Sequence, residues 1–96
     1  MNPYILAPLA REDLREIWDR IAEDDFDTAD RVVDEIHSAI LLLTSRPMMG
    51  HVRRDLAPPE YRFWPIYSYL IIYRPNTSPI EIVRVWHAAQ HRPRLV

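Results

Sequence analysis

The first half of the chain repeats its apolar positions with the period of an α-helix. After Pro8, which suits the first position of a helix, an apolar residue recurs every three or four positions: Leu14, Ile17, Trp18 and Ile21. This spacing forms one apolar stripe and predicts a helix that ends near Asp24. The short apolar segment 2–7, which lies before it between two prolines, predicts a strand at the edge of a sheet.

A second helical pattern follows after a short link. Asp25 or Asp27 suits its N-cap, and its apolar positions again step by three and four residues: Phe26, Ala29, Val33, Ile36, Ile40 and Leu43. The short link predicts that the two helices run antiparallel as a hairpin. The apolar seam can pack as core against a sheet or can form a groove for a peptide. A hairpin has enough faces for both roles.

The pattern changes after residues 46–50, where a proline stops the helix and Gly50 permits a positive φ. Residues 53–56 predict a weak strand or a turn. Residues 60–66 predict a strand, which Pro65 keeps away from the centre of a sheet.

The unbroken apolar run 69–73 is typical of a central strand that is buried on both faces. A turn at 75–79 leads to a last strand, 80–87, which is close enough to pair with the central strand as a hairpin. Strict alternation along the last strand would place four side chains on one face: Ile80, Ile82, Arg84 and Trp86. The order of elements predicts one α+β domain over residues 1–96. It has an N-terminal strand, an antiparallel helical hairpin and then a three- to four-stranded, mainly antiparallel sheet.

The composition excludes several kinds of chemistry. All 12 basic residues are Arg, Gly50 is the one glycine, and there is no Cys. Without Lys there is no Schiff base and no phosphate-binding loop of the Walker type, and one glycine cannot build a glycine-rich nucleotide cradle. The missing Cys removes disulfides, thiol nucleophiles and Cys-ligated zinc. We therefore expect no cofactor, while an apolar fraction of 48% is enough for a folded core.

Charge is distributed unevenly along the chain. Residues 1–45 carry four Arg against eleven acids, a net charge of −7, and residues 46–96 carry eight Arg against three acids, a net charge of +5. This division indicates a surface that meets an anionic partner, although solvated helix faces would give the same count. No segment approaches the roughly 18 apolar residues of a membrane span, and the N-terminus lacks a secretion-signal pattern. We expect a cytoplasmic protein with no membrane partner.

Two side chains near the end of the chain are candidates for chemistry. Arg84 is the charged member of an otherwise apolar strand face, so it either pairs with a helix acid or recognises an anion at a cleft. His87 can act as a general base, a polar contact or a structural hydrogen-bond partner, because an imidazole titrates near neutral pH. His91 lies four residues away, as zinc ligands do on a helix. His87 ends a strand, however, and no third ligand is near in sequence, so we expect no metal site.

Arginines interleave with aromatic residues in the second half, as they do on nucleic-acid-binding faces: Arg53, Arg54, Arg62, Arg74, Arg84, Arg92 and Arg94 beside Tyr61, Tyr67, Tyr69, Tyr73 and Trp86. Arginines would contact phosphates and the rings would stack on bases. A small sheet needs the same aromatic residues for its core, so direct nucleic-acid binding is not the favoured interpretation. No serine lies on a turn of the kind that carries a catalytic nucleophile.

Four segments together point to one family. They are Leu6-Ala7-Pro8-Leu9-Ala10 followed by Asp13-Leu14 and Ile17; Pro47-Met48-Met49-Gly50 with Arg54-Asp55-Leu56; Arg62-Phe63-Trp64-Pro65 with Tyr69-Leu70-Ile71-Ile72-Tyr73-Arg74; and Glu81-Ile82-Val83-Arg84-Val85-Trp86-His87. In this order and at this spacing they cover nearly the whole chain, which resembles a toxin of the RelE/ParE superfamily of type II toxin–antitoxin modules. The resemblance implies the RelE/ParE-like α+β fold.

Within the superfamily, the resemblance favours the ParE branch. RelE-type toxins are implied to cut messenger RNA on the ribosome, with several basic residues and often a C-terminal Tyr. When the strands are aligned on Tyr69, Pro65 falls at the position where those nucleases carry a catalytic Arg. This chain also has no Lys, and it has no Tyr after Ile80. Messenger RNA cleavage of the RelE type remains the alternative, and its candidate catalytic residues are Arg62, His87 and Arg92.

ParE-type toxins are implied to inhibit DNA gyrase by binding, without being enzymes. The residues that would contact the target or the antitoxin, or support the contact surface, are Arg62, Pro65, Tyr73, Arg74, Arg84, His87 and Arg92. The family often continues after its His with Gly-Ala-Arg-Asp, whereas this chain reads Ala88-Ala89-Gln90-His91, so Arg92 would have to replace the family's Arg.

A cognate antitoxin is the partner that the resemblance implies. An acidic segment of the antitoxin would fold over the basic side of the sheet, and an apolar helix would occupy the groove of the hairpin. Neutralisation would then be occlusion of the toxin surface. A third interpretation is a non-toxic interaction domain on the same fold.

Overall fold

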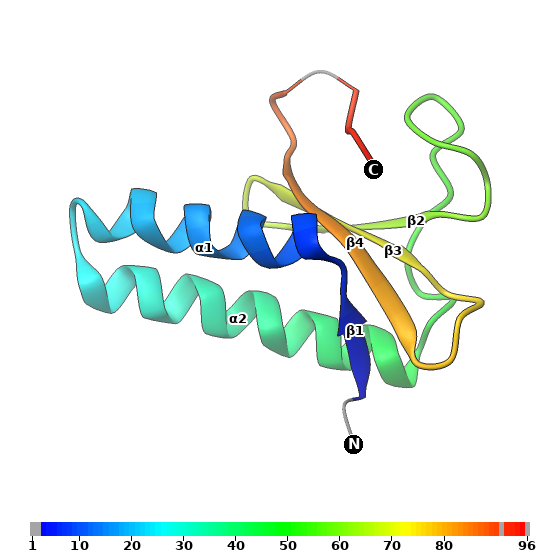
Figure 1. The fold of residues 1–96 in the computed structure, drawn as a ribbon, viewed down its shortest axis with the longest axis horizontal. Coiled ribbons are helices and arrows are strands. Elements are labelled where there is room, and N and C mark those ends of the chain that lie inside the picture. The colour runs from blue at the N-terminus through cyan, green and yellow to red at the C-terminus, as the bar shows by residue number, and fades with distance from the viewer. Residues whose placement is uncertain (1–2, 91, 96) are drawn as a thin grey trace.

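Two helices pack side by side on one face of a four-stranded sheet (Figure 1). The computed structural model describes residues 3–90 and 92–95. Its elements, in chain order, are β1 (Tyr4–Leu6), α1 (Pro8–Ala22), α2 (Phe26–Ser45), β2 (Arg62–Ile66), β3 (Tyr69–Arg74) and β4 (Ile80–His87). The predicted α+β architecture is confirmed. The first strand is shorter than the predicted segment 2–7, of which Asn2 lies outside the described residues.

The strand order in the sheet is β1-β4-β3-β2. β1 pairs parallel with β4 and the other two pairs are antiparallel, so the sheet is mainly antiparallel, as predicted. β3 lies between two neighbours, and the successive residues Ile71, Ile72 and Tyr73 are all buried, which confirms the predicted central strand. Pro65 lies on β2, an edge strand, where a residue without an N–H is tolerated. Residues 53–56 form a turn.

Local signals set the ends of the helical hairpin. Pro8 is the first residue of α1, as predicted. Of the two predicted N-caps of α2, Asp25 is the one used, because its carboxylate accepts hydrogen bonds from the hydroxyl of Thr28 and from its backbone N–H (3.1 Å). The bond from the hydroxyl, and then that from the N–H, lower the pKa of Asp25 because both favour the charged carboxylate.

The helices and the sheet share one apolar core. Its buried residues are Ala10, Leu14, Ile17, Val32, Ile36, Ile40, Leu43, Ile71, Tyr73, Ile80, Ile82 and Val85. The predicted seam of α2 is wrong at one end, because Phe26 exposes 67% of its surface whereas Val32 is buried. Phe26 instead stacks on Trp18 of α1, with 5.8 Å between the ring centroids. The stacked rings close the hairpin at its turn.

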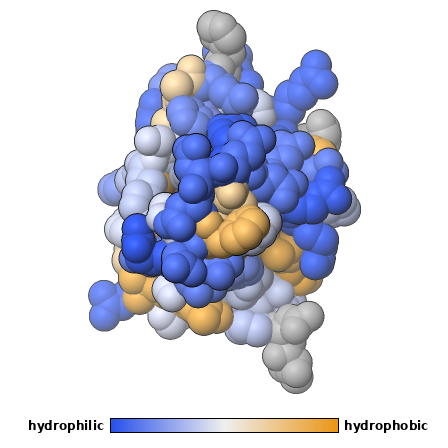
Figure 2. Space-filling view, turned by 90° about the vertical axis from the view of Figure 1, so that its left-hand side faces the viewer, coloured by the Kyte–Doolittle hydropathy of each residue, from blue (hydrophilic) through white to orange (hydrophobic). Residues whose placement is uncertain are grey.

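The end of the hairpin at the α1–α2 turn is largely polar. Figure 2 faces the end where α1 turns into α2, and it shows a mostly hydrophilic face with a hydrophobic patch near its centre. Neither α1 nor α2 combines the length and the apolar character that crossing a membrane requires.

An extra residue in β4 changes which of its side chains face the helices. Ile82 and Arg84 lie opposite consecutive residues of β3, so Val83 between them has no partner in the ladder. An extra residue of this kind inverts the alternation of faces beyond it. Ile82 and Val85 therefore both belong to the core, and the strict alternation predicted from the sequence is wrong beyond Ile82.

Candidate functional site

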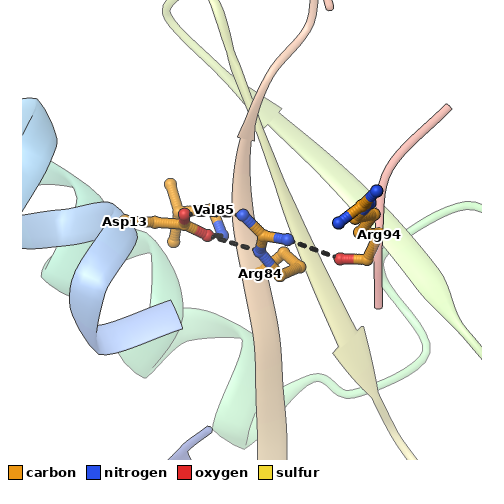
Figure 3. A network of polar contacts seen from close by, with 4 residues as sticks. All are labelled: Asp13, Arg84, Val85 and Arg94. Carbon is orange, nitrogen blue, oxygen red and sulfur yellow. Dashed lines mark hydrogen bonds and ion pairs between the residues drawn. The ribbon is translucent and has the colours of Figure 1, made fainter. Parts of the chain in front are cut away.

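A buried ion pair joins α1 to β4 (Figure 3). Arg84 donates hydrogen bonds from Nε and Nη2 to the two carboxylate oxygens of Asp13, each at 2.8 Å. Both side chains are almost nine-tenths buried. Of the two roles that the sequence left open for Arg84, the structure places it in the pair with a helix acid. The Asp13 carboxylate raises the pKa of Arg84 because it favours the charged guanidinium.

Asp13 also completes the outer edge of β4. β1 pairs with β4 as far as Ile82, whose carbonyl accepts the Ala7 N–H at 2.9 Å. Just beyond that point, the Asp13 carboxylate accepts the Val85 N–H at 3.0 Å. A buried N–H without an acceptor is destabilising, so Asp13 takes the place of a neighbouring strand for this hydrogen bond.

Arg84 also holds the segment that follows β4. Its Nη1 donates to the backbone carbonyl of Arg94 at 2.6 Å (Figure 3). The guanidinium lies over the Trp86 ring, 4.7 Å from its centroid, which is a cation–π contact. One guanidinium thus links α1, β4 and the C-terminal segment.

Tyr73 and Gly50 fix the segment that follows α2. The buried Tyr73 hydroxyl donates to the Pro47 carbonyl at 2.7 Å and accepts the Gly50 N–H at 2.9 Å. Gly50 does not adopt a positive φ, so the predicted reason for this glycine is wrong. A Cβ at this position would lie 2.8 Å from Cε1 of Tyr73, and a residue without Cβ allows the close approach. Burial raises the pKa of the Tyr73 hydroxyl. The side chain therefore supports the segment after α2 from inside the protein.

Arg62 braces the same segment from β2. Its Nη1 donates to the Gly50 carbonyl at 2.7 Å and, at a longer 3.4 Å, to the Met48 carbonyl. Carbonyl oxygens orient the guanidinium but do not neutralise it. Arg62 therefore keeps its positive charge at this surface.

Arg74 and Pro65 lie on neighbouring strands of the sheet. Arg74 pairs with Glu81 across the β3–β4 ladder, with 3.6 Å between Nη1 and Oε1. Both side chains are partly exposed, so water weakens this ion pair. Pro65 is exposed on the edge strand β2, where a partner can reach it.

His87 ends β4, as predicted, and its ring is held on two sides. Its Nδ1 accepts the Ala89 N–H at 3.1 Å, which assigns the proton of the neutral ring to Nε2. The ring meets Tyr69 edge to face, with 5.4 Å between the centroids. His87 lines a cleft of about 470 Å³ between α1 and the end of β4, together with Glu16 and Arg20.

Arg92 lies in the C-terminal segment and lines a different pocket. The other residues that line this pocket are Arg54, Leu56, Ala57, Pro58 and Pro59. None of these residues lines the cleft at His87. Arg92 and His87, five residues apart in the chain, therefore open onto separate places.

The structure does not bring the predicted nuclease residues together. Arg62 pairs with Tyr73, and His87 pairs with Tyr69, which precedes Tyr73 by four residues in β3. At about 3.3 Å per residue, Arg62 and His87 are roughly 13 Å apart along the strand direction. The Arg62 guanidinium also bonds to the segment at Gly50 rather than turning toward His87. The strand positions of Arg62 and His87 are therefore well separated, and Arg62 is held at the segment around Gly50.

No group of three or more His, Asp or Glu side chains that could hold a metal ion occurs in residues 3–90 and 92–95. Whether His87 and His91 lie close enough to share a metal ion is not tested, because His91 lies outside the described residues.

Sequence reasoning missed two supporting residues, Asp13 and Pro47. The charged Arg84 on an apolar strand was a signal that a buried acid exists. It did not identify Asp13, because residues 1–45 hold eleven acids. Nothing in the sequence indicated that the Pro47 carbonyl bonds to a tyrosine 26 residues away.

Comparison with known proteins identifies the family. Residues 4–92 match the family model described as the ParE toxin of the type II toxin–antitoxin system parDE. The chain is 31% identical over 86 residues to Toxin ParE1 of Mycobacterium tuberculosis, in strains CDC 1551 / Oshkosh and ATCC 25618 / H37Rv. That match covers 88% of this chain and 87% of the relative.

The fold is also similar to a solved structure, described as the chromosomal ParDE TA system from P. aeruginosa. The TM-score is 0.73 with 20% sequence identity, over 88% of this chain and 92% of that chain. The element order, the match over residues 4–92 and the M. tuberculosis relative agree, and the chain belongs to the ParE toxin family of type II toxin–antitoxin systems.

Proposed function

We propose that this chain inhibits DNA gyrase by binding to it and that a cognate antitoxin neutralises it. The family match over residues 4–92 carries the proposal, because the ParE resemblance implies a gyrase inhibitor that is not itself an enzyme. Arg62 and Pro65 on β2 and Arg92 in the C-terminal segment are the side chains that we assign to the target surface. Arg84 and Tyr73 position that surface from inside.

The placement of the basic side chains supports binding rather than RNA cleavage. General acid–base cleavage needs several groups within reach of one 2′-hydroxyl and one scissile phosphate. Arg62 and His87 lie near opposite ends of β3, and Arg92 opens onto another pocket. A protein target can contact such dispersed groups across an extended surface.

Exposed apolar side chains support an antitoxin as the partner. Ile5 on β1 exposes 47% of its surface, and Leu41 and Leu42 on α2 expose 48% and 44%. Ile5 and Leu41 line one pocket, and β1 is an edge strand that an added strand can pair with. An apolar antitoxin segment would cover these side chains, and an acidic one suits the +5 charge of residues 46–96.

Production of the chain in cells without an antitoxin tests the proposal. We expect growth arrest and a DNA-damage response while messenger RNA stays intact. In purified assays, the protein inhibits supercoiling by gyrase and cleaved DNA accumulates, and co-produced antitoxin abolishes both effects. Arg62→Ala weakens the inhibition, whereas Arg31→Ala on α2, which removes the same charge elsewhere, leaves it unchanged.

Two outcomes would replace the proposal. Rapid messenger RNA cleavage in translating extracts that is lost in Arg92→Ala would identify a RelE-type nuclease. Normal growth at a verified level of folded protein would identify a non-toxic interaction domain.

A further inference from the structure

We propose that the pocket between residues 53–59 and the C-terminal segment binds a phosphate group of the DNA backbone through Arg54 and Arg92. The pocket has a volume of about 340 Å³, and its other lining residues are Leu56, Ala57, Pro58 and Pro59. The proposal rests on the proposed function in one respect, since gyrase inhibition supplies the reason why DNA is present.

The charge of this pocket is positive and not neutralised. Asp55, which follows Arg54 in the chain, is held by Arg53, whose Nε and Nη2 donate to the two carboxylate oxygens at 3.0 and 2.8 Å. The Arg53 bonds lower the pKa of Asp55, and the charge of Arg92 adds to this effect. Within the described part of the chain, Arg54 and Arg92 have no salt bridge of their own. The one carboxylate shown to interact with Arg92 is thus already bound by Arg53.

Both arginines lie on segments that other contacts hold. The loop is closed by hydrogen bonds from the N–H groups of Leu56 and Ala57 to the Arg53 carbonyl, at 2.9 and 3.0 Å. The C-terminal segment is held where Arg84 donates to the Arg94 carbonyl, and Arg84 is itself fixed by Asp13 (Figure 3). A site on held segments loses less conformational freedom when a ligand binds.

The chemistry of the pocket favours a phosphodiester. Two guanidinium groups present planar sets of donors that match the non-bridging oxygens of a phosphate. The remaining wall is apolar, and it offers contact to a sugar but no side-chain donor or acceptor for a base edge. Such a pocket positions a nucleic-acid backbone without reading its sequence.

Binding of the full-length protein to a fluorescent DNA duplex, measured at several salt concentrations, tests the site. The double variant Arg54→Gln/Arg92→Gln is expected to lose about tenfold in affinity at low salt, and the slope of log K against log salt falls by about one. The matched control is Arg11→Gln/Arg31→Gln, which removes two positive charges from the helices. It leaves the slope unchanged. An unchanged slope in the pocket variant, or an equal loss in the control, would overturn the site.

Competition with inorganic phosphate distinguishes a phosphate of the DNA backbone from free phosphate as the ligand of the pocket. For a DNA backbone site, inorganic phosphate displaces the duplex only slightly better than chloride does at equal ionic strength, because it replaces one of several phosphate contacts. Displacement by phosphate at a much lower ionic strength would identify free phosphate as the ligand and overturn the assignment to DNA.

A gyrase assay separates this inference from the proposed function. Inhibition of gyrase together with DNA binding that is insensitive to the pocket variant refutes the inference and leaves the proposed function intact. DNA binding that depends on the pocket, without any gyrase inhibition, supports the inference and refutes the proposed function.

Discussion

At the scale of single residues, Asp13 and Arg84 connect segments that are 71 residues apart in the chain. The Asp13 carboxylate accepts two bonds from Arg84 and one from the Val85 N–H. Removing two charges from water is unfavourable, and these bonds offset that penalty only while both partners are present. The pair therefore fixes where α1 and β4 meet more than it adds to stability.

Asp13→Asn is predicted to destabilise the protein by about 3 kcal/mol, because it leaves the buried Arg84 guanidinium without a counter-charge. Urea denaturation followed by tryptophan fluorescence measures the change. Glu12→Gln is the control, since Glu12 pairs with Arg15 at an exposed position and its loss changes stability by less than about 0.5 kcal/mol. Equal effects of the two substitutions would show that the buried pair is not important for stability.

Tyr73→Phe is predicted to cost about 1–3 kcal/mol. It keeps the ring in the core but leaves the Gly50 N–H and the Pro47 carbonyl without their partner. Tyr61→Phe, at a half-buried position, is the control and changes the free energy of unfolding by less than about 0.5 kcal/mol. A similar, small effect of both changes would contradict a role for the Tyr73 hydroxyl.

The raised pKa of Tyr73 also predicts a loss of stability in alkali. The unfolded tyrosine releases its proton near the ordinary value of 10.0, while the folded residue still holds it. The contribution of Tyr73 is therefore complete below pH 10 and is lost as the pH rises through the folded-state pKa. Thermal unfolding between pH 8 and about pH 11 should show a steeper decline for the natural protein than for Tyr73→Phe.

At the scale of elements, α2 has a buried face and, near one end, exposed apolar side chains. Its buried positions, including Ile36, pack against α1 and the sheet. Leu41 and Leu42 remain exposed near its C-terminal end. Since a helix repeats every 3.6 residues, one amphipathic element can serve the core and also offer an apolar surface to a partner.

Substitutions on the two faces of α2 should separate stability from antitoxin binding. Ile36→Ala is predicted to cost about 2–5 kcal/mol, because the side chain is fully buried. Leu42→Ala is predicted to change stability by less than about 1 kcal/mol but to weaken antitoxin binding about tenfold, since a covered apolar side chain contributes roughly that much. Isothermal titration with the purified antitoxin measures the second effect. Unchanged affinity would place the antitoxin elsewhere.

Asp25→Ala is predicted to lower the melting temperature at neutral pH, because α2 loses its N-cap. The pKa of Asp25 is below its ordinary value of 3.8 in the folded protein, so its contribution is present above that pH and is lost as the pH falls through the folded-state pKa. The difference between variant and natural protein should therefore disappear in strong acid. Asp24→Ala, one residue before the cap, is the control and should show no such dependence.

At the scale of the whole molecule, the fold separates its charges. The acidic residues 1–45 build β1 and both helices, and the basic residues 46–96 build β2, β3, β4 and the C-terminal segment. Buried and local pairs neutralise Arg84 and Arg53, whereas Arg54, Arg62 and Arg92 keep their charge. The field of the molecule should therefore steer an acidic partner to the sheet side.

Association with an acidic antitoxin is predicted to slow as salt increases. The association rate should fall about tenfold or more between low salt and about 0.5 M salt, while the dissociation rate changes little. Stopped-flow fluorescence of the stacked Trp18 and the other tryptophans can follow the reaction. An association rate that is independent of salt would exclude electrostatic steering.

The sequence predicted the order and type of the elements because their signals are local. The period of apolar residues, Pro8 at the start of α1 and the apolar run of β3 all act within one element. The prediction was wrong at Phe26, which stacks on Trp18 instead of entering the core. It was also wrong beyond Ile82, because one extra residue inverts the faces of β4. Both errors depend on how one element meets another.

The sequence by itself determined the α+β class, the helical hairpin, the family and the division of charge. It also required that Arg84 find a partner, since an unpaired guanidinium on a buried strand is strongly unfavourable. Only the tertiary structure decided that Asp13 is that partner and that the Tyr73 hydroxyl is buried against the segment after α2. It also decided that Arg62, His87 and Arg92 lie at separate parts of the surface. The reason is that the periodicity of a helix or a strand depends only on residues that are close in the sequence. The pairing of distant residues is fixed by register and packing, which a single bulge can shift.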